Sequence, residues 1–116
     1  MKIWKALIAL PVAALAGQAA AENWVTVASN DDGSLLVVDK DTIRRGSDGL
    51  VYYTDDTGDQ RDAMAADCAK QTSYTLSRDL IIGQRVDNPN WRNNGEAVQP
   101  GSFGDAELKY VCANAG

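Results

Sequence analysis

Four aspartates between residues 55 and 62 are the side chains of this sequence best suited to chemistry. Carboxylate oxygens of the kind that bind calcium or act as acids and bases are supplied by Asp55, Asp56, Asp59 and Asp62. Their spacing does not match a helix–loop–helix calcium site, which needs acidic residues at alternate positions ahead of a glycine. We therefore interpret the stretch as a solvated acidic loop, and we predict no metal site.

Other catalytic groups are scarce. The chain contains no histidine, the commonest general base near neutral pH and the commonest transition-metal ligand. Ser102 is preceded by Gly101, but the glycine two residues before the serine of a nucleophile elbow is missing, so a helix-capping role is favoured. No glycine-rich phosphate loop is present. We predict no catalytic residue, no cofactor and no enzyme activity; a carboxylate-based hydrolase or a calcium module is the least favoured alternative.

The first 21 residues have the pattern of an export signal. A positive start is followed by an apolar run over residues 6–15 and by small residues at 19–21. This pattern predicts a signal peptide over 1–21 with cleavage between Ala21 and Glu22, and a periplasmic or extracellular protein. The ten-residue run is about half of the roughly 20 residues needed to cross a bilayer, so we expect no membrane insertion of the mature chain.

The remaining residues, 22–116, are long enough for a single domain with one modest core. They contain two cysteines, Cys68 and Cys112, and an even count in an exported chain predicts one disulfide. Closing a loop of about 45 residues stabilises the fold by about 4 kcal/mol in the loop-entropy model. Two free buried thiols are the alternative.

Charge restricts the partners. Residues 22–116 carry nine basic and 16 acidic side chains, a net charge of −7. Nucleic acid is excluded on this balance, because its binding relies on lysine and arginine neutralising phosphates. An acidic surface attracts basic partners, although it also serves solubility.

Period-two patterns and turn residues predict a mostly antiparallel β-sheet. The clearest pattern runs over 72–80, where Tyr74 and Leu76 alternate with polar residues and Arg78 falls on their side. The alanine-rich segment 63–69 is compatible with helix or strand; we predict a strand forming a hairpin with 72–80, with Cys68 facing the core. Further predicted strands cover 24–29, 34–39, 42–45, 50–54 and 81–86, and 87–101 is predicted to be a long loop.

The last element is predicted to be a helix. Ser102 followed by Asp105 resembles a capping box, and Leu108, Val111 and Cys112 share one face at spacings of three and four. The predicted fold class is therefore α+β, an antiparallel sheet of five to six strands with one C-terminal helix packed on one face and tied by a disulfide.

Aromatic and arginine side chains are candidates for a binding surface. Tyr52 and Tyr53 are adjacent on a strand, so one of them points away from the covered face. Trp91 with its neighbouring arginine forms either a recognition tip or an anchor that folds the loop back onto the domain, and the anchor is favoured. The pair Arg44 and Arg45 suits an edge strand, where charge discourages strand addition.

These segments resemble the surface-adhesin protein E family of exported bacterial proteins. The matching pieces span nearly the whole mature chain in the family's order. They are Trp-Val-Thr-Val at 24–27, Val-Asp at 38–39, Thr-Ile-Arg at 42–44, Asp-Cys at 67–68, Pro-Gly-Ser-Phe-Gly at 100–104 and Val-Cys at 111–112.

The resemblance implies a six-stranded antiparallel sheet with a disulfide-tied C-terminal helix, a homodimer, and adhesion to host matrix or plasma proteins. This sequence departs from an outer-membrane adhesin because no cysteine lies near the end of the signal to carry a lipid anchor. The leading hypothesis is a non-enzymatic exported binding protein similar to surface-adhesin E. The alternative is a periplasmic inhibitor or accessory factor of a basic cell-envelope enzyme such as a lysozyme.

Overall fold

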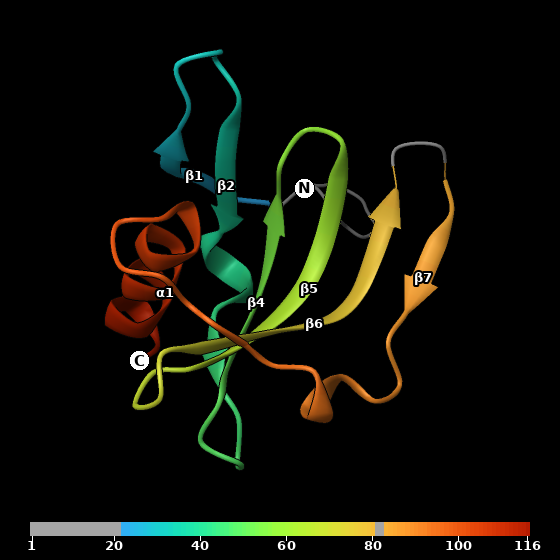
Figure 1. Cartoon of the computed structure of the whole chain (residues 1–116), viewed down its shortest axis with the longest axis vertical. Coiled ribbons are helices and arrows are strands. Elements are labelled where there is room, and N and C mark those ends of the chain that lie inside the picture. The colour runs from blue at the N-terminus through green and yellow to red at the C-terminus, as the bar shows by residue number, and fades with distance from the viewer. Residues whose placement is uncertain (1–21, 81–82) are drawn as a thin grey trace, which may run out of the picture.

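The computed structural model describes residues 22–80 and 83–116 (Figure 1). Within these ranges the chain forms one antiparallel sheet in the order β1-β2-β4-β5-β6-β7, with β3 paired to β4 and β8 paired to β6. The strands are β1 (Trp24–Ser29), β2 (Leu35–Asp39), β3 (Arg44–Arg45), β4 (Val51–Asp56), β5 (Gln60–Asp67), β6 (Thr72–Leu80), β7 (Arg85–Asp87) and β8 (Glu96–Ala97). Single turns of 3-10 helix, η2 (Lys40–Thr42) and η3 (Trp91–Asn93), precede β3 and β8, and α1 (Phe103–Asn114) follows.

The predicted class is correct, but the count of five to six strands is too low, since the described residues form eight. Three of them, β3, β7 and β8, are only two or three residues long. A two-residue strand such as β3 or β8 is too short to show an alternation of apolar and polar residues. The predicted strand 81–86 is represented by β7; residues 81 and 82 lie outside the described residues. The predicted loop 87–101 contains both η3 and β8.

The acidic stretch 55–62 is not the solvated loop predicted from its composition. Strands β4 and β5 pair from Val51 opposite Ala66 to Asp56 opposite Arg61, so Asp55 and Asp62 are strand residues facing each other. A tight turn remains, closed by the Thr57 amide donating to the Gln60 carbonyl at 3.1 Å. These residues form strands despite their polar side chains, because strand pairing satisfies the hydrogen bonds of their backbone N–H and C=O groups.

Helix α1 packs on one side of the sheet, which we call the helix face; the opposite side is the outer face. Figure 1 shows α1 beside β1, β2 and β4, while β6 and β7 extend away from it. The core between helix and sheet comprises Val38, Val51, Tyr53, Met64, Ala66, Leu108 and Val111. Each buried aliphatic side chain of this kind contributes about 1.5 to 3 kcal/mol before entropy is counted.

The start of α1 is capped as the sequence predicts. The Asp105 amide donates to Ser102 Oγ at 3.1 Å, and the Gly101 amide donates to Asp105 Oδ2 at 2.9 Å. This reciprocal pair satisfies donors that the first helical turn leaves unpaired. The Gly101 amide, followed by Lys109, lowers the pKa of Asp105, which holds the capping carboxylate ionised.

The predicted disulfide between Cys68 and Cys112 is present, with Cα atoms 6.0 Å apart and a sequence separation of 44. It joins the end of β5 to the inner side of α1. Met64, Ala66 and Cys68 share the helix face of β5, as predicted. The disulfide therefore holds α1 over the half of the sheet that contains β1, β2 and β4.

Candidate binding surfaces

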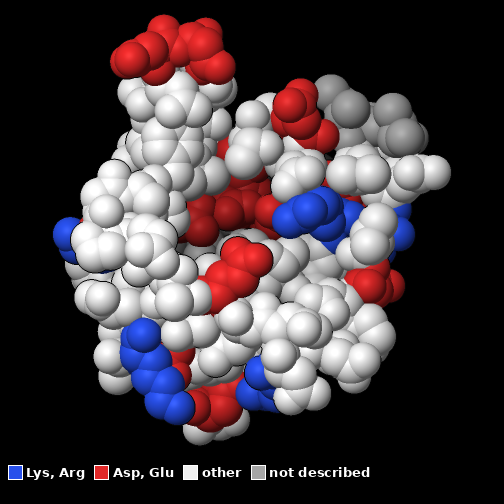
Figure 2. Space-filling view, in the orientation of Figure 1, with Lys and Arg blue, Asp and Glu red and all other residues white. Residues whose placement is uncertain are grey.

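Carboxyl groups form a row across the helix face, at the margin of the part that α1 covers. Strand register places Asp55 opposite Asp62 and Asp62 opposite Arg78, and α1 brings Glu107 over Asp55. Asp55, Asp62 and Glu107 are only 4%, 6% and 4% exposed. Figure 2 shows acidic side chains inside the hollowed centre of this face, next to basic ones.

Asp55 and Glu107 form a pair of neighbouring buried carboxyl groups. Asp55 Oδ1 and Glu107 Oε2 are buried without a donor as long as both carboxyls are ionised. Burial, together with the contact to Glu107, raises the pKa of Asp55 from 3.8 to about 10. The raised pKa keeps the proton on Asp55 at neutral pH, so that this carboxyl can act as a hydrogen-bond donor beside Glu107.

Two more groups complete the row. The Tyr53 hydroxyl donates to Glu107 Oε1 at 2.7 Å, and burial raises the pKa of Tyr53 well above its ordinary value. Arg78 Nε donates to Asp62 Oδ1 at 3.2 Å. Burial raises the pKa of Asp62, and the charge of Arg78 opposes this shift.

A bulge in the sheet brings Arg78 to this face. The pairing of β5 with β6 shifts register between Ala63 and Met64, so that Thr75 lies opposite Met64 while Arg78 lies opposite Asp62. The sequence prediction that Arg78 shares a face with Tyr74 and Leu76 is therefore wrong. An extra residue in one strand reverses the alternation beyond it, and a period-two pattern does not reveal it.

Beyond the row, the uncovered half of the helix face holds a polar hollow of about 410 Å³. We use this name for the space over β6 and β7, beside the segment from η3 to β8. Its walls combine hydroxyl, carboxamide and charged side chains. They belong to Ser73, Thr75, Ser77, Arg78, Val86, Asp87, Asn88, Asn94 and Glu96.

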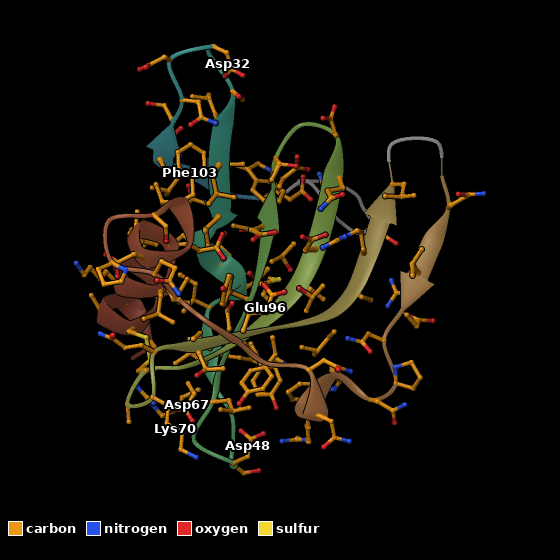
Figure 3. The ribbon with its side chains drawn as sticks, viewed as in Figure 1. Asp32, Asp48, Asp67, Lys70, Glu96 and Phe103 are labelled. Atoms are coloured by element: carbon orange, nitrogen blue, oxygen red, sulfur yellow. A yellow bond between two sulfur atoms is a disulfide. The ribbon has the colours of Figure 1, made fainter. Side chains whose placement is uncertain are left out.

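A second concave region separates the β1–β2 hairpin from the β4–β5 turn. This hairpin groove, of about 380 Å³, is lined by Gly33, Ser34, Leu35, Val37, Asp56, Thr57 and Gly58. Leu35 is 47% exposed within it, and exposed aspartates lie at the turns on either side, Asp31 and Asp32 on one and Asp59 on the other. In Figure 2 the projecting hairpin ends in acidic side chains, and Figure 3 labels Asp32 there.

The outer face carries an aromatic cluster with arginines. Trp91 packs edge-on against Tyr52 and Tyr74, with ring centroids 6.2 and 5.5 Å apart. Arg44 lies 5.0 Å from the Tyr52 ring centroid, and Arg92 lies 4.3 Å from that of Trp91. These contacts confirm that Trp91 folds its loop back onto the domain.

The two adjacent tyrosines point to opposite sides, as predicted. Tyr53 is 3% exposed on the helix face, whereas Tyr52 lies in the outer cluster, where its hydroxyl donates to Asp48 at 2.5 Å. Arg45 donates to the Gly49 carbonyl within the β3–β4 hairpin. Arg44 thus belongs to the aromatic cluster, and Arg45 contributes to the β3–β4 hairpin.

Of the predicted cleavage site, Ala21 lies outside the described residues, and Glu22 accepts hydrogen bonds from Trp24 and Arg61. Sequence reasoning missed Glu107 altogether. Its helix position was visible, but its partners Tyr53 and Asp55 are more than 50 residues away. The one local signal was Val51-Tyr53-Asp55 at spacing two, which places Asp55 on the buried face.

Among residues 22–80 and 83–116, no three side chains of metal-ligand type converge to hold an ion. Nor does any helix in those ranges have the length and apolar character to cross a bilayer. Compared with family models, curated proteins and solved structures, the chain matches none of them.

Proposed function

We propose that this chain is a non-enzymatic exported binding protein, similar to surface-adhesin E, that docks a basic protein at its acidic hairpin groove. The observation that carries the proposal is the exposed Leu35 between two aspartate-bearing turns. A protein-binding patch combines an apolar contact with a polar rim, and at this groove the rim carries exposed charges of one sign.

Charge defines the chemistry of the partner. Asp31, Asp32 and Asp59 are all exposed, and the segment 22–116 carries −7 overall. A surface of this sign steers a basic protein toward the groove and repels an acidic one. Two kinds of protein could be this partner. One is a host matrix or plasma protein outside the cell, and the other is a basic cell-envelope enzyme such as a lysozyme.

The experiment measures binding of the oxidised chain to lysozyme and to fractionated host serum by surface plasmon resonance at low and high salt. The variant Asp31→Asn/Asp32→Asn removes two charges from the groove while keeping side chains that suit a turn. The matched control, Asp41→Asn/Asp67→Asn, removes two charges elsewhere; Figure 3 places Asp67 at the opposite end from Asp32.

We expect the groove variant to bind at least about fivefold more weakly, mainly through slower association, and the control to bind like the parent chain. Affinity should fall as salt rises, because exposed charges are screened beyond about 10 Å at 0.1 M salt. Equal weakening by both variants, or an affinity indifferent to salt, would refute docking at the groove. Lysozyme binding without serum binding would favour the envelope partner.

A further inference from the structure

The polar hollow shares no lining residue with the hairpin groove. Its size and lining suit a small-molecule ligand. Its volume, about 410 Å³, falls within the roughly 300 to 1,000 Å³ typical of ligand pockets. Its lining is dominated by groups that both donate and accept hydrogen bonds. We propose that it binds a short saccharide that is neutral or carries an amino group. This proposal does not rest on the docking function of the groove.

Three of the lining side chains are already held in place by the protein. Asn88 Nδ2 donates to the Thr75 carbonyl at 3.0 Å, and Asn94 Nδ2 donates to the Asn90 carbonyl at 3.0 Å. Arg78 Nε donates to the buried Asp62 at 3.2 Å. Side chains fixed in this way lose little entropy when a ligand binds.

Each anchored side chain keeps unused hydrogen-bonding capacity. The two carboxamides retain their Oδ1 acceptors, and the Arg78 terminal nitrogens have no ion-pair partner among the described residues. Hydroxyls of Ser73 and Thr75 lie along the floor on β6. Adjacent hydroxyl groups of a sugar each donate and accept, which suits a wall that mixes amide oxygens, guanidinium nitrogens and hydroxyls.

The electrostatics exclude an acidic sugar. The charge of Arg78 is offset by Asp62, and that of Asp87 by Arg85. Glu96 adds a negative charge from β8, on the segment that crosses in front of the sheet; it is labelled in Figure 3. The net negative field favours a neutral ring or an ammonium group near Glu96.

The test is an NMR titration of isotope-labelled protein with three disaccharides: that of N-acetylglucosamine, its deacetylated diamine, and an acidic hexuronate. We expect saturable shifts of amides in β6 and in the 88–96 segment with the first two only. Asn94→Ala, which removes the free acceptor, should weaken binding about 3- to 10-fold. Its control is Asn114→Ala, because Asn114 Nδ2 makes the same exposed bond to the carbonyl four residues earlier, at 2.8 Å, far from the hollow.

A second variant examines the charge argument. Glu96→Gln should leave the N-acetyl disaccharide bound and abolish the preference for the diamine. The proposal is overturned if no sugar causes a shift at a concentration of about 10 mM, ten times a Kd of about 1 mM. Preferred binding of the hexuronate also overturns it. If the Asn94→Ala and Asn114→Ala variants bind the sugar with equal affinity, the sugar binds outside the hollow and the proposal is wrong. Loss of lysozyme or serum binding in the groove variant has no bearing on these outcomes.

Discussion

The helix face and the outer face of the same strands hold charged side chains in different surroundings. On the helix face, Asp55 and Glu107 are two neighbouring carboxyl groups in a buried space, and burial raises the pKa of Asp55 to about 10. On the outer face, Asp48 and Arg92 carry opposite charges at 3.1 Å, with side chains 28% and 61% exposed. Burial makes the first pair sensitive to pH and to the placement of α1, whereas solvent makes the second nearly neutral for stability.

The largest effect is expected from releasing the helix that carries Glu107. Replacing both cysteines in Cys68→Ser/Cys112→Ser removes the constraint on a loop of about 45 residues. The free energy of unfolding should fall by about 4 kcal/mol, measured by urea denaturation. The reduced parent chain serves as the control and should match the variant. A loss under about 1 kcal/mol would mean that packing of α1, and not the disulfide, sets the geometry of the pair.

Next in size is the pH dependence that arises at Asp55. The folded protein holds one more proton than the unfolded chain between the unfolded pKa near 3.8 and the folded pKa of about 10. Stability contributed by this group is therefore complete below pH 3.8 and is lost as pH rises toward the folded pKa. Urea denaturation from pH 5 to 9 measures this slope.

Asp55→Asn carries no titrating proton, and its amide can donate to Glu107 in place of the protonated carboxyl. The variant should lose most of the slope and be more stable than the parent at pH 8. Asp59→Asn, at the exposed turn four residues away, should keep the parent's slope. Parallel slopes for Asp55→Asn and the parent would show that Asp55 is ionised in the folded protein.

The outer face depends on shape rather than charge, and Gly95 tests this. A Cβ atom at Gly95 would lie 2.5 Å from Tyr74 Cε2 and 2.8 Å from Thr72 Cγ2, so Gly95→Ala forces the aromatic cluster apart. We expect a loss of about 1 to 3 kcal/mol, with reduced Trp91 fluorescence change on unfolding.

Gly104→Ala provides the matched control for this substitution. Its Cβ meets only ordinary contacts at 3.7 Å in the first turn of α1, so the change should be neutral or stabilise by up to about 1 kcal/mol through helix propensity. If Gly95→Ala proves as harmless as Gly104→Ala, the cluster is loosely packed and contributes little order to the 88–96 segment.

Local signals in the sequence were sufficient for some of these features. The Ser102–Asp105 cap depends on residues three positions apart, and the disulfide had only one possible pairing, so both were predicted correctly. For Trp91, an anchor that folds the loop back was favoured over a recognition tip, and the contacts of its ring agree. In each case the physical cause lies within a few residues or in a forced choice.

Features that depend on register could not be predicted. Whether Arg78 meets Asp62 depends on a bulge that is visible only when β5 and β6 are paired. Whether Asp55 is buried depends on α1, 50 residues later, and composition alone made it look solvated. The hollow is likewise a consequence of how far α1 reaches across the sheet, which no local pattern encodes.

The smallest effect is expected at Arg92, where the contrast between the two faces is sharpest. Arg92→Gln removes the pair with Asp48 and the contact above Trp91, yet the Arg92 side chain is 61% exposed, and solvent screens its charge. Tm should match the parent within experimental error at both low and high salt. Its pH profile from 5 to 9 should also keep the slope assigned to Asp55. A salt-dependent loss of Tm here, comparable to that of Gly95→Ala, would mean that the outer cluster depends on charge after all, and that exposure is not what distinguishes it from the buried carboxyl pair.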